Sequence, residues 1–153
     1  MTCDYLSLAL PGVQKLSPYV PGKPVEELAR ELGLRAADIV KLASNENPLG
    51  PSPAALEAIQ AALPELTRYP DGNGFVLKQA LAAHYGVDTA MLVLGNGSND
   101  ILELIARAFV TPQDEVLFSA HAFAVYPLVT QAIGARPVVV PAADWGHDLN
   151  AMA

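Results

Sequence analysis

The sequence predicts an α/β fold in which parallel strands alternate with helices. Apolar runs without polar alternation, at 91–94, 116–118 and 137–140, are typical of strands that a sheet buries on both faces. The segments between them, 99–110 and 123–133, have the length and composition of helices. Because strand, helix, strand, helix and strand follow one another, we expect a parallel sheet with helices on both faces, a three-layer α/β/α arrangement.

The first part of the chain lacks this alternation. Prolines and glycines crowd residues 11–24, and we expect an extended arm over residues 1–24. A short strand is predicted at 39–43. Helices are predicted at 25–32, ended by Gly33, at 53–63, begun by Ser52 and Pro53, and at 75–85, ended by Gly86.

Composition restricts the classes of function. The 153 residues are 52% hydrophobic, and 9 basic against 16 acidic residues give a net charge of −7 without a basic cluster, which argues against nucleic acid and membranes as partners. Cys3 is the single cysteine and the three histidines show no ligand spacing, so neither a disulfide nor a metal site is expected. No export signal or membrane-length apolar run is visible, and we expect a cytoplasmic protein.

The most informative segment is the glycine-rich turn Gly-Asn-Gly-Ser-Asn-Asp at 95–100, between an expected strand and an expected helix. The first turn of a helix carries unpaired N–H groups and the positive end of the dipole, which together favour a phosphate. A P-loop would need a lysine after the second glycine, and a dinucleotide fingerprint would need a third glycine where Asp100 stands. A single phosphate monoester fits this turn better, although an ordinary capped turn is the alternative interpretation.

Together with three other segments, this turn resembles the fold-type I pyridoxal-phosphate aminotransferases, and most closely the histidinol-phosphate aminotransferases. The resemblance extends from Tyr19 to Met152, and the motifs occur in that family's order and spacing. The motifs are Tyr-Val-Pro-Gly-Lys-Pro (19–24), Leu-Ala-Ser-Asn-Glu-Asn-Pro-Leu-Gly (42–50), Arg-Tyr-Pro-Asp-Gly (68–72) and Gly-Asn-Gly-Ser-Asn-Asp (95–100).

The resemblance implies how pyridoxal 5'-phosphate is held. Gly97, Ser98 and Asn99 match the turn whose amides and side chains bind the cofactor phosphate. Phe123 matches the aromatic residue that stacks on the pyridine ring, where a tyrosine or tryptophan is common; a plain core aromatic is the alternative.

Three further residues match positions around the substrate and at a subunit interface. Tyr69 matches a tyrosine that bonds the cofactor phosphate of the neighbouring subunit, which implies a homodimer; a surface tyrosine is the alternative. Tyr19 and Asn45 match the arm and the loop that close over the substrate.

The resemblance also implies a division into an N-terminal arm with a small-domain segment, 1–50, and the first part of the cofactor-binding large domain, 51–153. The implied reaction exchanges an amino group between histidinol phosphate and 2-oxoglutarate, with imidazole acetol phosphate and glutamate as the other pair, in histidine biosynthesis. No lysine here matches the family's Schiff-base lysine, so we expect an inactive N-terminal fragment of a longer enzyme and assign no catalytic residue. A decarboxylase of threonine phosphate and a non-catalytic phosphate-binding domain remain alternatives.

Overall fold

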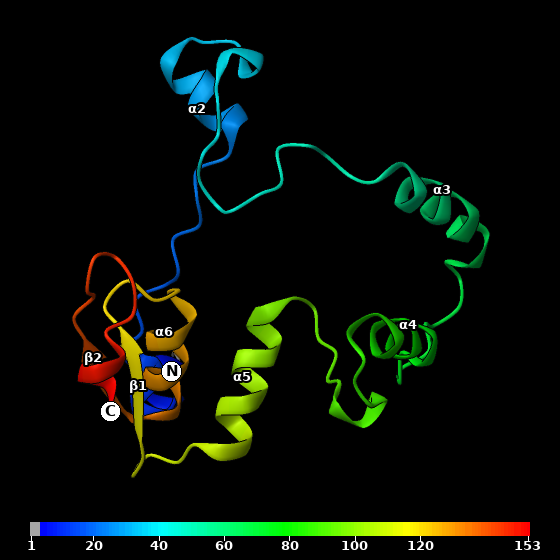
Figure 1. The fold of residues 1–153 in the computed structure, drawn as a ribbon. Helices are drawn as coiled ribbons and strands as arrows, with labels where there is room; N and C mark the ends of the chain where they lie inside the picture. Colours follow the sequence, from blue (N-terminus) through cyan, green and yellow to red (C-terminus); the bar gives the residue numbers. More distant parts are fainter. Residues whose placement is uncertain (1–3) are drawn as a thin grey trace. The chain divides into compact units, whose positions relative to one another are not determined.

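The computed structural model describes residues 4–153, so Cys3 lies outside the described residues. The chain divides into two compact units (Figure 1). One contains the segment up to Tyr19 together with Leu81–Ala153, and the other is Val20–Ala80. The domain boundary expected at residue 50 stays a prediction, because compact units of this chain are not the domains of a longer enzyme.

A parallel sheet of two strands organises the first unit. Strand β1 (Glu115–Ser119) pairs with β2 (Arg136–Val140), and the register places Glu115 opposite Arg136 and Ser119 opposite Val140. Helix α6 (Val125–Ile133) forms the crossover that a parallel pair requires. The strands predicted at 116–118 and 137–140, and the helix between them, are confirmed.

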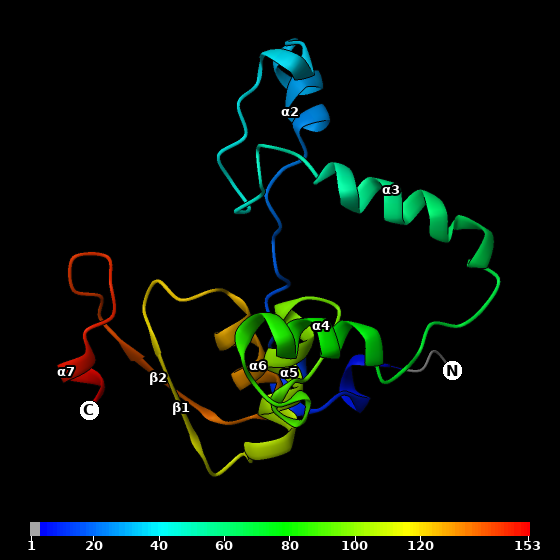
Figure 2. The same ribbon diagram turned by 45° about the vertical axis from the view of Figure 1, so that its right-hand side comes forward.

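Helices α5 (Ser98–Phe109) and α6 lie on the same side of this sheet (Figure 2). The buried side chains Phe118, Val125 and Val140 form the centre of the packing. Thr130 is also buried, and its hydroxyl donates a hydrogen bond of 2.7 Å to the Tyr126 carbonyl, so no polar group is left without a partner there.

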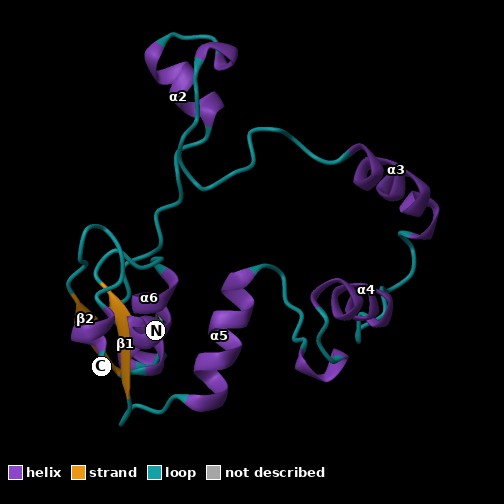
Figure 3. Cartoon of the chain, in the orientation of Figure 1, coloured by secondary structure: helices purple, strands orange, loops and turns teal. Residues whose placement is uncertain are grey.

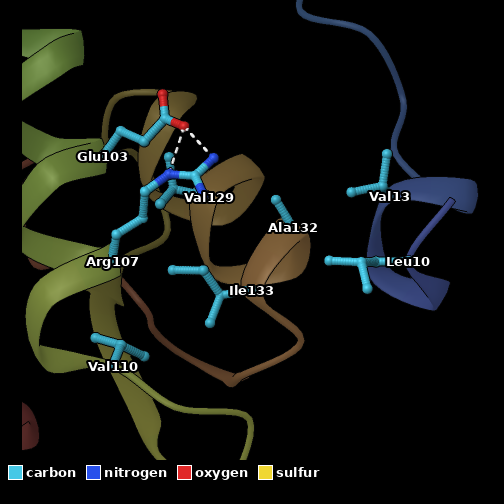
Figure 4. Close-up of a pocket in the computed structure, with 8 residues that line it drawn as sticks. All are labelled: Leu10, Val13, Glu103, Arg107, Val110, Val129, Ala132 and Ile133. Carbon is cyan, nitrogen blue, oxygen red and sulfur yellow. Dashed lines mark hydrogen bonds and ion pairs between the residues drawn. The ribbon is translucent and has the colours of Figure 1, made fainter.

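The short helix α1 (Pro11–Gln14) packs on α6. A Cβ atom at Gly12 would collide with the Gln131 carbonyl oxygen, so only glycine allows this approach. Leu10 and Val13 face Ala132 and Ile133 across a pocket of about 370 Å³ (Figure 4). The arm at 1–24 is therefore not extended throughout, since this apolar contact stabilises a helical turn within it.

Residues 91–94 do not form a strand, contrary to the prediction. A 3₁₀ turn, Thr89–Met91, leads into Leu92 with extended dihedrals (φ −107°, ψ 123°). The only strands among the described residues are β1 and β2, which pair with each other (Figure 3). Of the predicted strand, Met91 belongs to the 3₁₀ turn and Leu92 is extended, but a strand also needs a hydrogen-bonded neighbour.

The second unit contains helix α2 (Val25–Leu32), ended by Gly33 at φ +65°, and helix α3 (Pro53–Ala62), preceded by Ser52. Helix α4 (Phe75–Tyr85) spans the boundary between the units. These three helices confirm the prediction. The strand predicted at 39–43 is wrong, because those residues follow a 3₁₀ turn at Ala36–Asp38 and pair with no described strand.

Side-chain carboxylates cap two helices. Asp71 accepts hydrogen bonds from the N–H groups of Phe75 (2.8 Å) and Asn73 (3.0 Å), and these bonds lower its pKa below the usual 3.8. Asp148 caps helix α7 (Leu149–Met152) through the N–H of Ala151 at 3.0 Å. None of the helices in residues 4–153 is long and apolar enough to cross a membrane.

Candidate functional site

The start of helix α5 is an open group of backbone donors. Its N-cap is Gly97, with φ +82° and ψ 178°, a conformation available essentially to glycine alone. No side chain caps this helix. Because the first N–H groups of a helix have no partner inside the helix, those of Ser98 and Asn99 are placed to bind an anion.

Asp100 fixes the shape of the turn before the helix. Its Oδ2 accepts hydrogen bonds from the backbone N–H (2.9 Å) and the side-chain Nδ2 (3.2 Å) of Asn96. A Cβ atom at Gly95 would lie 2.9 Å from the Asp100 Cβ and 2.9 Å from the Ile101 Cδ1, so the turn is too tight for any residue but glycine. The carboxylate is therefore engaged in holding the turn.

A pocket of about 380 Å³ opens at the carboxyl end of β1. Its walls include Phe118 and Ser119 of the strand, and His121 and Phe123 of the loop that joins β1 to α6. The N-terminus of α5 lies at this same end of the unit (Figures 1 and 2). Ligands of parallel sheets bind beyond the carboxyl ends of the strands, which is this end.

The structure brings two of the predicted site residues into contact. The rings of Tyr19 and Phe123 meet edge-on, with 6.5 Å between their centroids and 82° between their planes. Gly97, Ser98 and Asn99 belong to the same compact unit as this pair. Phe123 is 43% exposed, so it is not the fully buried core aromatic of the alternative interpretation.

Asn45 and Tyr69 belong to the other unit, Val20–Ala80. Asn45 lies in a loop with an unusual positive φ of +49°. The Tyr69 side chain is fully exposed within the chain, beside a surface pocket with Arg68 and Pro70. A side chain with this exposure is available to a second molecule.

One aromatic contact near the pocket was not predicted from the sequence. The Trp145 ring lies 4.9 Å from the His121 ring, with 36° between the planes. Trp145 sits at the tip of a tight hairpin, with Asp144 and Trp145 both at positive φ (+47° and +63°) between Ala143 and Gly146. Such two-residue turns usually carry asparagine or glycine, so the residues Asp144 and Trp145 did not indicate this hairpin.

His121 and His147 both line the pocket, but within residues 4–153 no three His, Cys, Asp or Glu side chains gather as a metal site would require. The chemistry available here is that of amide donors at a helix start, an exposed aromatic ring and a neighbouring tyrosine.

The chain is similar in sequence to known aminotransferases. The histidinol-phosphate aminotransferase 2 of Pseudomonas aeruginosa is 69% identical over 149 residues, which cover 97% of this chain and 40% of the relative. The histidinol-phosphate aminotransferase of Stutzerimonas stutzeri is 63% identical over 152 residues, covering 99% of this chain and 41% of the relative. The chain thus spans about 40% of the length of these curated relatives.

Solved structures agree with the sequence relatives. The histidinol-phosphate aminotransferase of Sinorhizobium meliloti, in complex with pyridoxal-5'-phosphate, superposes with a TM-score of 0.75 at 32% identity, covering 93% of this chain and 37% of that one. The family model for aminotransferase class I and II matches residues 37–153. This chain therefore belongs to the class I and II aminotransferase family.

Proposed function

We propose that this chain is the N-terminal part of a pyridoxal-phosphate-dependent aminotransferase that exchanges an amino group between histidinol phosphate and 2-oxoglutarate. The observation that carries the proposal is the uncapped start of α5 at Gly97, at the same end of the unit as the pocket lined by Phe123, in a chain 69% identical to a histidinol-phosphate aminotransferase. When bound, pyridoxal phosphate supplies an electron sink for the amino-group carbon.

The residues present fit this cofactor. Ser98 and Asn99 offer backbone N–H groups to the phosphate, and the glycine cap at Gly97 leaves space, since a Cβ atom there would meet nothing within 4 Å. The half-exposed ring of Phe123 provides a face for the pyridine ring. Ser98, Asn99 and Phe123 would thus bind and orient the cofactor, while proton transfer needs residues that this chain does not supply.

The remaining predicted site residues bind the substrate or act in the site of a second subunit. Tyr19, which contacts Phe123, and Asn45, on its strained loop, close over the substrate. Tyr69, exposed in its own chain, bonds the phosphate in the partner's site, so the active enzyme is a homodimer. We also propose that the enzyme acts in the cytoplasm, which would suit a biosynthetic role.

The test is turnover by the purified full-length protein that carries this chain. We expect glutamate formation from 2-oxoglutarate with histidinol phosphate as amino donor, dependent on added pyridoxal phosphate. Release of CO₂ from threonine phosphate without amino transfer would contradict the proposal and favour the decarboxylase. Binding of phosphate ligands without either reaction would favour a non-catalytic domain.

A further inference from the structure

The loop that carries Asn45 has two consecutive residues in the left-handed region. Ser44 and Asn45 follow one another at φ +71° and +49°, and neither is a glycine. Asparagine adopts this conformation more readily than other residues with a Cβ atom, but serine does so rarely, and two such residues in a row need contacts that hold them. The question is therefore which contacts hold this loop.

An ion pair spans the two strained residues. The Lys41 Nζ lies 2.6 Å from Glu46 Oε1, so the pair joins one side of Ser44–Asn45 to the other. The Lys41 side chain is only 24% exposed, less than either partner of any other ion pair in the described chain. The Glu46 side chain is 60% exposed, so only the lysine end of the pair is partly shielded from solvent.

The loop is also held on its two flanks. The segment before α2 runs back beside the loop (Figure 1), and a Cβ atom at Gly22 would lie 2.7 Å from Ser44 Oγ. Downstream, the Asn47 side chain accepts from the N–H of Leu49 (3.0 Å) and donates to the Gly50 carbonyl (3.1 Å). Neither flank crosses Ser44 and Asn45, so the direct connection across them is the Lys41–Glu46 pair.

We propose that Lys41 and Glu46 are positioning residues, which hold Asn45 in its left-handed conformation and thereby present its side chain to the substrate. The proposal rests on the proposed function, because it takes from it that Asn45 binds substrate. It adds an assignment for two charged residues, Lys41 and Glu46, that act through Asn45.

The test uses the full-length enzyme with Glu46→Gln, Lys41→Met and the exchanged pair Lys41→Glu/Glu46→Lys. Breaking the pair should raise the KM for histidinol phosphate about threefold to tenfold, with kcat and cofactor affinity unchanged, because ground-state positioning is lost. The exchanged pair should recover most of the KM. Hydrogen exchange of the amides at 44–50 should be faster in the single variants and return toward wild type in the exchanged pair.

A matched control is Glu65→Gln, which breaks the Arg68–Glu65 pair (2.8 Å) in the same unit but on a different segment of the chain. It should leave the KM and the loop exchange unchanged. Wild-type KM and exchange rates in both single variants would overturn the proposal. If the wild-type protein has no turnover, the proposed function fails and with it the link to substrate; the exchange rates then still test whether the Lys41–Glu46 pair holds the loop.

Discussion

The ring of Tyr19 meets the ring of Phe123 edge-on, with the centroids 6.5 Å apart and the planes at 82°. Edge-to-face contacts are a preferred geometry for aromatic pairs. Phe123 also lines the pocket at the end of β1 and is 43% exposed, so part of its ring is accessible to a flat ring. The arm residue predicted to face the substrate is thus in contact with the residue predicted to stack on the cofactor.

This contact leads to a prediction for Phe123. Phe123→Ala in the full-length enzyme should weaken pyridoxal-phosphate binding by about 1 kcal/mol or more, the scale of one aromatic contact with its buried area. Phe123→Tyr should retain the affinity, because the ring is kept. Phe109→Ala, which removes an exposed ring at the far end of α5, is the control. Equal cofactor affinity in Phe123→Ala and in the control would contradict the stacking role.

Tyr69 is predicted to act across the dimer interface. Tyr69→Phe should weaken cofactor binding by about 1–2 kcal/mol, because one hydrogen bond to a charged group is lost. Tyr85→Phe, another exposed tyrosine, should have no effect.

The activity of mixed dimers tests whether Tyr69 acts in the site of the partner subunit. One mixed dimer pairs a Tyr69→Phe subunit with a subunit that keeps Tyr69 but lacks the cofactor-linked lysine. The other pairs a wild-type subunit with a subunit that carries both changes. If Tyr69 acts in trans, the first dimer should be the more active, because its lysine-bearing site receives the partner's tyrosine. Loss of affinity confined to the subunit that bears the substitution would show that Tyr69 serves its own site.

Asp71 predicts a dependence of stability on pH. The N–H groups of Phe75 and Asn73 hold the pKa of this carboxyl below 3.8 in the folded state, so the charged form stabilises the fold. That contribution is complete above the pKa of the unfolded chain and is lost as pH falls through the folded pKa.

Asp71→Asn should therefore lower the free energy of unfolding at pH 7 and flatten its fall on acidification. Urea unfolding of both proteins between about pH 7 and pH 2 measures this. Asp114→Asn should behave alike, because the N–H and hydroxyl of Thr111 lower that carboxyl's pKa too. Parallel stability profiles for wild type and Asp71→Asn would contradict the capping argument.

Local signals account for what the sequence predicted well. Helix α2 ends at Gly33, and α6 and its two flanking strands have their periodicity and stop signals within a few residues. The strands predicted at 91–94 and 39–43 failed because strand formation depends on a neighbour that the local pattern does not specify.

The candidate site also contains features that local sequence predicted and features that it did not. The glycine cap of α5 was predictable, because Gly97 stands between an apolar run and a helix. The contact between His121 and Trp145, and the ion pair across Asn45, were not. Both occur beside positive φ angles at residues other than glycine, and at Ser44 and Trp145 local sequence preference opposes that conformation.

Gly97→Ala is predicted to damage both the helix start and the cofactor site. A Cβ atom at φ +82° should cost about 1–3 kcal/mol of stability, and the shifted amides should lose affinity for the phosphate. Gly33→Ala, at φ +65° with equally open space, is the matched control: it should destabilise the fold without altering cofactor affinity in the folded enzyme. Cofactor affinities that fall equally in both variants would mean that Gly97 acts on stability alone.

The central claim is that the start of α5 holds the cofactor phosphate. A crystal structure of the full-length enzyme with pyridoxal phosphate tests it directly, through the distances from the phosphate oxygens to the backbone nitrogens of Ser98 and Asn99. We predict at least one of these N–H groups within about 2.7–3.2 Å of a phosphate oxygen. A phosphate bound elsewhere, with no oxygen in hydrogen-bonding distance of either nitrogen, would contradict the account.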